Sequence, residues 1–488
     1  MPRLLPQLSR RRLLQSAAAL CAPPLRAAAE PLDLRQSQLF LDDAWIEETA
    51  RLERVWAAAE IVPEPVLKPE APWEGIQIVM FGSVFRMANE WRMYYLAYNR
   101  PQPALACMAT SQDGLHWERP NLGLVEYGGN RRNNILWLPS DGESTDGPTV
   151  LHEPDDAAAP FKMLYYGYGG KRATGEYVAF SKDGIQWTRR PQPVLTSTGD
   201  KTNLMAARDH RGKYVAYLRE KTMMQKYGSR SVSRSESADF LHWSEPELVL
   251  RPDLLDDPNT ELYGMSVFPY AGMYIGLLER WYDHPDVIEV QLAWSRDGLG
   301  WKRPQVRRAF IGPTYPWNKG WNSCANTPPI RMGNQLWFYF GGRTSAHGRE
   351  TPRSYGAIGL ASTGVDQFAA LRADFIEGRL VTRPMTWPGG DLILTCTNTR
   401  YPDAHPTSGG GQIAVEVRDE SNAPIPEFSG ERKAAHNVVS PRPWEAKEPP
   451  VRWPGGRSLD TLKGRRIRIV VRLRDARIYS FRAREVAA

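Results

Sequence analysis

Cysteine is scarce in this chain, with four residues among 488, and the four are far apart: Cys21, Cys107, Cys324 and Cys396. This spacing shows neither a disulfide framework nor the close pairs that bind zinc. Long apolar runs are also missing, so we expect no stable membrane insertion. No long segment has the periodicity of an amphipathic helix. The sequence therefore indicates a strand-rich chain, for which we predict no metal site and no cofactor.

The chain also has little excess positive charge when residues 1–29 are left out of the count. The formal net charge is +7, but residues 1–29 hold five arginines and no acidic residue. The chain from Glu30 onward then carries +2. A basicity confined to one terminal segment does not indicate nucleic-acid binding. We expect no nucleic-acid partner.

The N-terminal segment resembles a twin-arginine export signal. The run Ser9-Arg10-Arg11-Arg12-Leu13-Leu14 precedes a weak apolar stretch and then Ala27-Ala28-Ala29, a small-residue cleavage site. We predict that residues 1–29 are a signal peptide, that the twin-arginine export machinery is a partner, and that the mature protein is periplasmic or secreted. The alternative is a basic tail whose adjacent arginines are coincidental.

A short phrase recurs along the chain, with the pattern Ser-x-Asp-Gly-x-x-Trp. It occupies residues 111–117, 181–187 and 295–301, with a degenerate copy at 235–243. The tryptophans are 70, 56 and 58 residues apart. Repeats of this length that hold several short strands are typical of a β-propeller with one blade per repeat. Asp-Gly suits a tight turn, and we interpret the phrase as structural.

Five aromatic strand-like runs support the count, at residues 91–98, 162–168, 213–219, 273–280 and 336–342. Beyond about residue 375, alternating segments such as 412–417 and 466–472 are separated by polar loops. We predict an all-β chain: a five-bladed β-propeller over residues 30–372, followed by a β-sandwich accessory domain over residues 376–488.

Four acidic residues stand near the start of the innermost strand of a predicted blade: Glu74, Asp146, Asp200 and Glu261. Innermost strands line the central channel, where polar groups converge. Glycoside hydrolysis needs two carboxyl groups, one protonated and one ionised. We predict Glu261 as the general acid and Glu74 or Asp200 as base or nucleophile, with Asp146 tuning a pKa or binding a hydroxyl. The alternative is that each acid caps a loop or pairs with a surface arginine.

Other residues at the same end of the blades are predicted to bind the substrate. Those near the first strands are Asn203, Tyr263, Trp321 and Asn322, and those ending the second strands are Arg219, Arg280, Arg343 and His347. Arginine can clamp a carboxylate, a sulfate or a sugar hydroxyl through paired hydrogen bonds. Ion pairing with acids at the rim is the alternative for the arginines.

The repeated turns, the blade count and the C-terminal module resemble the five-bladed propeller glycosidases of glycoside hydrolase families 32 and 43. Pro72-Trp73-Glu74 and Thr260-Glu261-Leu262-Tyr263-Gly264 resemble an exported bacterial branch. The resemblance implies an exported glycoside hydrolase that cleaves plant or algal glycans. The alternative is a carbohydrate-binding propeller without catalysis.

The catalytic motifs of the invertase type are nevertheless missing from this chain. Its Trp-x-Asn-Asp-Pro and Glu-Cys motifs are absent, and its Arg-Asp-Pro is found only as Arg208-Asp209-His210 in a predicted turn. The site prediction therefore depends on blade position alone.

Overall fold

The computed structural model describes residues 33–99, 102–138, 143–220, 228–282, 285–345, 347, 349, 351, 353–398, 411–436 and 448–485. Within these ranges the chain is all-β, and its helices are short 3-10 turns at Pro316–Asn318, Gly430–Arg432 and Leu459–Leu462. The predicted all-β class is confirmed. Residues 1–29, the predicted signal peptide, lie outside the described residues. In the described ranges, no helix has the length and apolar character needed to cross a membrane.

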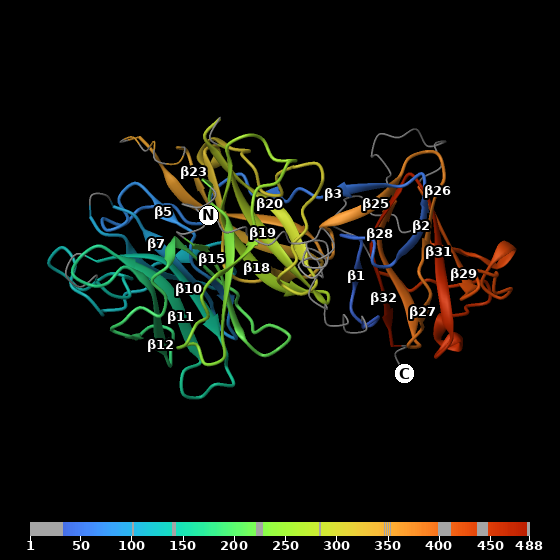
Figure 1. The fold of residues 1–488 in the computed structure, drawn as a ribbon, viewed down its shortest axis with the longest axis horizontal. Helices are drawn as coiled ribbons and strands as arrows, with labels where there is room; N and C mark the ends of the chain where they lie inside the picture. The colour runs from blue at the N-terminus through green and yellow to red at the C-terminus, as the bar shows by residue number, and fades with distance from the viewer. Residues whose placement is uncertain are drawn as a thin grey trace, which may run out of the picture.

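Antiparallel sheets follow one another along the first two thirds of the chain and form the left-hand lobe of Figure 1. Sheet one holds β5 (Ile78–Val79), β6 (Val84–Arg86), β7 (Trp91–Ala97), β8 (Leu105–Ser111) and β9 (Trp117–Glu118). Sheet two holds β10 (Ser144–His152), β11 (Phe161–Tyr168), β12 (Gly175–Ser181) and β13 (Thr188–Arg189). Sheet three holds β14 (Thr198–Leu204), β15 (Tyr214–Glu220), β16 (Val232–Ser237) and β17 (Glu247–Leu250).

The next sheet has two parts that we treat as sheets four and five. Sheet four holds β18 (Thr260–Tyr270), β19 (Met273–Tyr282) and β20 (Val287–Ser295). Sheet five holds β21 (Trp321–Cys324), β22 (Ile330–Met332), β23 (Gln335–Arg343), β24 (Gly356–Gly364) and the earlier strand β4 (Glu60–Ile61). A single parallel bridge between Ile288 and Trp321 joins the two parts.

Three Ser-x-Asp-Gly turns each connect one sheet to its neighbour. In the first turn, Ser111 Oγ accepts hydrogen bonds from the backbone of Asp113 and Gly114. The carbonyl of Gly114 then accepts from Tyr339 Oη of sheet five at 2.7 Å. Equivalent bonds run from Tyr94 of sheet one to Gly184 and from Tyr217 of sheet three to Gly298. The turns are therefore structural, because their polar groups are used within and between sheets.

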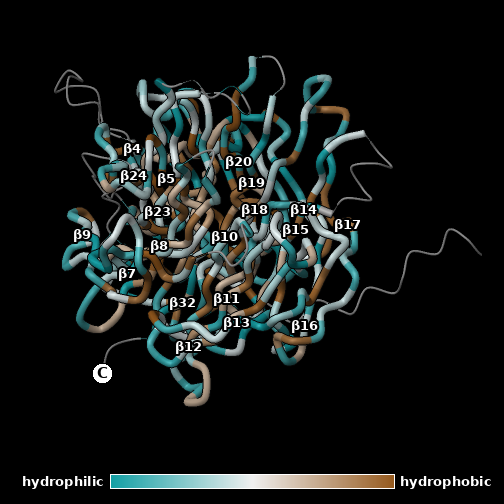
Figure 2. Tube along the Cα trace, turned by 90° about the vertical axis from the view of Figure 1, so that its left-hand side faces the viewer, coloured by the Kyte–Doolittle hydropathy of each residue, from teal (hydrophilic) through white to brown (hydrophobic). Residues whose placement is uncertain are grey.

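The sheets contact one another in a closed ring. Figure 2 shows them arranged about a centre near β10, with sheet one at the left, sheet two below, sheet three at the right and sheets four and five above. Sheet five meets sheet one through the bond from Tyr339 to Gly114, and sheet four meets sheet five through Tyr270, whose Oη lies 2.7 Å from Asp366 Oδ1. This ring brings the first strands of successive sheets to one central region.

The right-hand lobe of Figure 1 consists of two sheets around one shared core. One sheet holds β1 (Gln38–Leu39), β3 (Glu53–Trp56), β25 (Ala369–Ala373), β28 (Asp391–Asn398) and β32 (Ala476–Arg484). The other holds β2 (Ile46–Ala50), β26 (Gly378–Thr382), β27 (Met385–Thr386), β29 (Gln412–Asp419), β30 (Ala434–Ala435) and β31 (Arg466–Arg474). Strands β1–β3, which we predicted within the propeller, thus pair with C-terminal strands, because apolar residues such as Phe40 and Ile46 complete that core.

Candidate functional site

Side chains from all five sheets of the ring meet around Tyr263, and we name this group the axial cluster. Its members are Tyr98, Asp146, Arg219, Arg230, Tyr263, Trp281, Trp321, Arg343 and His347. The Tyr263 ring lies 4.8 Å from the Trp321 ring and 5.3 Å from the His347 ring, measured between centroids. The guanidinium of Arg219 lies 4.9 Å from the same ring. The structure thus brings together six of the residues that the sequence analysis chose for the site: Asp146, Arg219, Tyr263, Trp321, Arg343 and His347.

Irregularities in three neighbouring inner strands shape this region. The pairing register shifts between Asp146 and Thr149 in β10, between Thr198 and Thr202 in β14, and between Leu262 and Gly264 in β18. Such bulges bend a strand and redirect its side chains, and they are common beside functional sites. The bulges therefore lie beside three of the acidic residues that the sequence singled out.

Asp146 is the acidic member of the axial cluster, and it is buried. Its residue is 4% exposed, and its Oδ1 accepts a hydrogen bond from the backbone N–H of Gly147 at 3.0 Å. Burial raises the pKa of Asp146 to about 6, although the nearby charges of Lys201, Arg343 and Arg219 oppose the shift. A carboxyl with this pKa can hold a proton near neutral pH and release it to a substrate.

Asp200 and Glu261 are more accessible and are paired with arginines. The side chain of Asp200 is 49% exposed and forms an ion pair with Arg219, and that of Glu261 is 23% exposed and pairs with Arg230. Both arginines lie against Tyr263, so the two acids flank the same tyrosine. The alternative of arginine pairing that the sequence left open therefore applies to both. Glu261 is thus held by Arg230, whereas Asp146 is the acid of this region without an ion pair among the described residues.

The floor beneath the axial cluster is closed by buried polar pairs. Lys201 Nζ lies 2.8 Å from Glu279 Oε1, and both side chains are fully buried. Gly264 leaves space for this lysine, since a Cβ there would lie 2.5 Å from Lys201 Cε. Asn203 donates from Nδ2 to Asn326 Oδ1 at 2.5 Å, so it is a floor residue without a free amide for substrate.

Lys201 and Glu279 were missed by the sequence analysis. The available signal was their position beside residues that it chose, since Lys201 follows Asp200 and Glu279 precedes Arg280.

Glu74 does not belong to the axial cluster, so its predicted role as base or nucleophile is wrong. Its side chain is fully buried, and its oxygens accept from Arg119 Nε at 2.8 Å and from Tyr95 Oη at 2.6 Å. The second oxygen also accepts from the backbone of Glu70 and Ala71. These bonds use the acceptors of the carboxylate. Glu74 therefore anchors the loop before β5.

Two predicted binding residues also lie elsewhere. Arg280 points away from Glu279, its neighbour on β19, and forms ion pairs with Asp256 and Asp257. Its side chain is thus committed to a buried charge cluster on the other face of the sheet. Asn322 is fully buried and exchanges hydrogen bonds with Asn318. Neither residue is placed to bind a substrate beside Tyr263.

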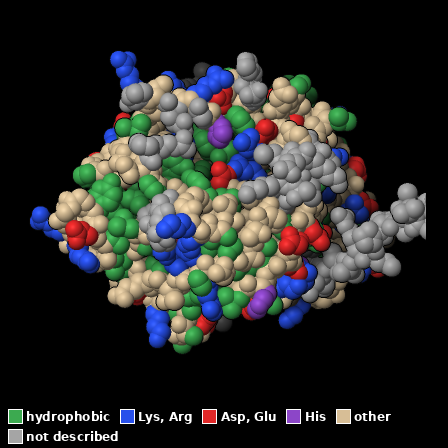
Figure 3. Space-filling view, turned by 60° about the vertical axis from the view of Figure 1, so that its left-hand side comes forward, with side chains coloured by type: hydrophobic (Ala, Val, Ile, Leu, Met, Phe, Trp, Pro, Cys, Tyr) green, Lys and Arg blue, Asp and Glu red, His purple; other side chains and the backbone are tan. Residues whose placement is uncertain are grey.

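His347 packs among aromatic rings at the edge of the cluster, 4.6 Å from Trp281 and 5.1 Å from Trp321 between centroids. Burial and the charges of Arg230, Arg343 and Arg219 lower its pKa to about 4, so the imidazole is neutral near pH 7. Figure 3 shows histidine, basic and acidic side chains gathered over apolar ones on a face of this lobe. Aromatic platforms with a few polar groups are typical of ligand sites.

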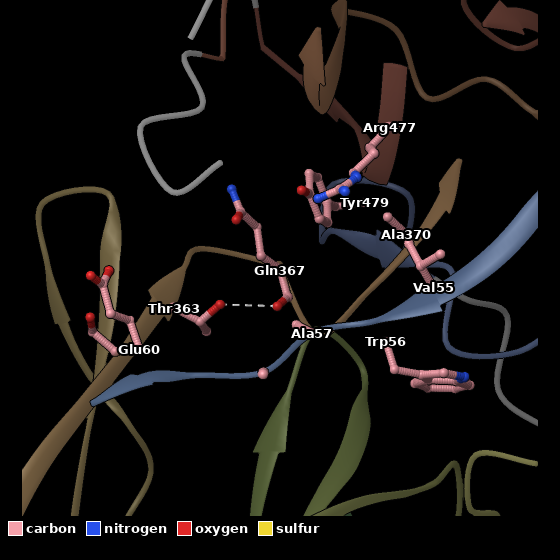
Figure 4. A pocket seen from close by; sticks show the side chains of 11 residues that line it. Val55, Trp56, Ala57, Glu60, Thr363, Gln367, Ala370, Arg477 and Tyr479 are labelled. Carbon is pink, nitrogen blue, oxygen red and sulfur yellow. Dashed lines mark hydrogen bonds between the residues drawn. The ribbon is translucent and has the colours of Figure 1, made fainter. Parts of the chain in front are cut away.

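A separate cavity of about 330 Å³ lies between the lobes (Figure 4). Trp56, Gln367, Arg477 and Tyr479 contribute to its wall, and Glu60 is the one acid among its described lining residues. A single carboxylate does not provide an acid and base pair. Among the described residues, no group of three histidine, cysteine or acidic side chains could hold a metal ion.

Comparison with known proteins found no matching family model and no matching curated protein. The resemblance to glycoside hydrolase families 32 and 43 therefore stays a prediction. Solved structures with a distant similarity include the following three. A β-1,2-mannobiose phosphorylase from Listeria innocua has 12% identity and a TM-score of 0.46, over 64% of this chain and 98% of that chain.

A glycosyl hydrolase from Bacteroides ovatus has 14% identity and a TM-score of 0.45, over 64% of this chain and 94% of its own. A structure described under the GH130 family of mannoside phosphorylases and hydrolases has 13% identity and a TM-score of 0.45, again over 64% and 94%. These values are too low to transfer an activity to this chain.

Proposed function

We propose that the protein is a glycoside hydrolase acting on plant or algal glycans, with its active site at the axial cluster. The observation that carries the proposal is the contrast between two acids on neighbouring inner strands. Asp146 is buried with a pKa raised to about 6, whereas Asp200 is half-exposed and paired with Arg219. One protonated and one ionised carboxyl group are what glycoside hydrolysis requires.

The roles follow from these environments. Asp146 donates its proton to the oxygen of the leaving sugar. That oxygen keeps the electron pair of the glycosidic bond as the bond breaks. Asp200 acts at the anomeric carbon, either directly or through a water molecule. Glu261 is the second candidate for the base or nucleophile. The faces of Tyr263 and Trp321 support the sugar ring.

A carbohydrate-binding protein without catalysis is the second candidate. It is favoured by the ion pairs of Asp200 and Glu261, because each ion pair must break before its carboxylate can act. The two candidates differ in turnover alone, since both require binding at the axial cluster.

A screen of aryl glycosides and plant and algal oligosaccharides tests the proposal. It uses the mature chain and the variants Asp146→Asn and Asp200→Asn. We expect hydrolysis of at least one substrate and, on the oligosaccharides, a loss of about 100-fold or more in each variant, as for removal of an acid–base catalyst. Exposed Glu64, which pairs with Lys68, supplies the control Glu64→Gln. Binding without turnover by the unmodified chain would favour the second candidate.

We also propose that the ring of sheets is a five-bladed propeller of the family 32 and 43 type, and that the protein is exported through the twin-arginine route. The ring of contacts supports the first proposal and the Arg10-Arg11 signal supports the second. Replacing Arg10 and Arg11 by lysine should trap precursor in the cytoplasm. Efficient export of that variant would contradict the twin-arginine route.

A further inference from the structure

Three buried hydrogen-bond donors of the axial cluster have no acceptor among the described residues. They are Arg219 Nη1, Arg230 Nε and Trp321 Nε1. Buried polar groups are almost always hydrogen-bonded, so each exception indicates a missing water, ion or ligand. The three side chains share one neighbourhood, because the guanidinium carbons of Arg219 and Arg230 and the centroid of the Trp321 ring lie 4.8–5.7 Å from the centroid of the Tyr263 ring.

The nearby acids are already engaged and leave these donors unsatisfied. Asp200 pairs with Arg219 and Glu261 pairs with Arg230. Buried acceptors without a partner among the described residues of this lobe include Glu176 Oε1, Glu279 Oε2 and Gln77 Oε1, whose residues are at most 3% exposed. His347 adds a neutral ring and no negative charge. Beside the Tyr263 ring, three buried donors thus remain without an acceptor among the described residues.

The aromatic rings hold these donors in place. The guanidinium of Arg230 lies 4.9 Å from the Trp281 ring, and that of Arg343 lies 4.1 Å from the Trp321 ring. Stacked guanidinium groups lose less freedom on binding, and their planar donors match the oxygens of a carboxylate or a sulfate. A sugar hydroxyl fits less well, because it brings a donor of its own.

We propose that the axial cluster binds an oxyanion carried by the glycan, either the carboxylate of a uronic acid residue or a sulfate ester. The inference rests on the proposed function, since it names the substrate class of the same site. In this proposal the buried donors of Arg219, Arg230 and Trp321 bind the charged group and so distinguish charged glycans from neutral ones.

The test measures binding by calorimetry with Asp146→Asn, so that turnover does not interfere. The probes are a uronic acid oligosaccharide and its carboxyl-reduced form, a sulfated oligosaccharide and its desulfated form, and inorganic phosphate alone. Hydrogen bonds to a charged group contribute about 1.5–3 kcal/mol, so we expect one charged probe to bind about 10–100-fold more tightly than its neutral form. The pair that shows the difference identifies the oxyanion.

Two variants added to that background test the assigned donors. Trp321→Phe removes the indole N–H and keeps an aromatic ring, and Arg219→Gln removes the fork of donors. Both should weaken binding of the charged probe about 10-fold and leave the neutral probe nearly unchanged. The control is Arg208→Gln, an arginine in the turn between β14 and β15 whose side chain is 40% exposed and pairs with Glu153. It should change neither affinity.

Equal affinity for charged and neutral probes would overturn the inference, as would an equal loss in Arg208→Gln. Binding of phosphate alone, without preference between the glycans, would also overturn it. Hydrolysis of neutral glycans by the unmodified chain would then leave the proposed function standing. Tight binding of a charged glycan that the unmodified chain never cleaves would instead support the inference and contradict the proposed function.

Discussion

Asp146 and Asp200 stand on neighbouring inner strands, yet burial and partners give them different chemistry. Asp146 lies among Lys201, Arg219 and Arg343, but the loss of hydration outweighs their attraction and raises its pKa. Asp200 keeps contact with solvent and an arginine partner. The difference between the two residues is therefore set by depth in the ring rather than by residue type.

The raised pKa of Asp146 makes stability depend on pH. The neutral carboxyl stabilises the fold fully below its ordinary pKa of 3.8, and this contribution is lost as pH rises through about 6. Asp146→Asn lacks this titration. Relative to the unmodified chain, the variant should gain about 3 kcal/mol in unfolding free energy between about pH 3.5 and about pH 7.5. Urea unfolding at both values checks this, and a pH-independent difference would contradict a buried titrating carboxyl.

Glu74 should behave as a structural residue. Glu74→Gln removes the charge opposite Arg119 in a buried pair, which typically costs about 3–5 kcal/mol. Exposed Glu64→Gln should cost less than about 1 kcal/mol, because its pairing with Lys68 is at the surface. Urea unfolding of both variants makes the comparison. A catalytic Glu74 would instead give a stable variant without activity.

The sequence predicted the acids of the central region well and their partners poorly. The repeat period located Asp146, Asp200 and Glu261 on inner strands, because strand order follows from blade order. It did not reveal that Glu74 pairs with Arg119, which lies 45 residues away, or that Lys201 pairs with Glu279 across two sheets. Such partners depend on how side chains pack within and between the sheets, and the spacing of a repeated phrase carries no information about that packing.

The Ser-x-Asp-Gly turn is the element whose structure was predicted most fully. Its glycine has φ +74° at Gly184, and the turn packs against a tyrosine of the preceding sheet. The sequence showed the turn chemistry, since Ser, Asp and Gly each have a local role. The docking tyrosine could be recognised only as a residue of an aromatic strand. The turn therefore both closes a hairpin and holds two sheets together.

Substitutions at two glycines can distinguish the local role of the turn from its contact with the neighbouring sheet. Gly184 and Gly212 have nearly the same φ, +74° and +75°. A Cβ on Gly184 would lie 2.5 Å from Tyr94 Oη, whereas a Cβ on Gly212 would meet nothing within 4 Å. Gly212→Ala should cost about 1–2 kcal/mol from backbone strain, and Gly184→Ala about 1–3 kcal/mol more from the clash. Equal losses in chemical unfolding would argue against docking through Tyr94.

In the whole molecule, strands from the N-terminal and C-terminal parts of the chain pair in one lobe, and Asp366 links that lobe to the ring of sheets. Strands β1 and β2 pair with β32 and β26, and Asp366 binds Tyr270 of sheet four and Ser480 of β32. The predicted boundary near residue 372 follows the change in sequence pattern, from aromatic repeats to alternating strands with polar loops. It does not reflect these pairings, because the sequence of a short N-terminal strand does not show which distant strand it pairs with.

A chain that ends at residue 376 should therefore fail to fold normally. It would lose β26–β32 and expose Phe40, Ile46 and Leu371, which belong to the core of the C-terminal lobe. We expect little soluble protein and no cooperative melting, in contrast to the full chain. A soluble truncated chain with a sharp thermal transition would show that the ring lobe folds without its partner lobe.

The central claim is that Asp146 protonates the leaving group of a glycan, and a leaving-group series tests it most directly. The measurement compares kcat/KM of the unmodified chain and Asp146→Asn on dinitrophenyl and alkyl glycosides of the same sugar. An acidic leaving group needs no proton, so we expect a loss of less than about 10-fold with the dinitrophenyl glycoside and more than about 1000-fold with the alkyl glycoside. Equal losses on both substrates would contradict the assignment of Asp146 as the general acid.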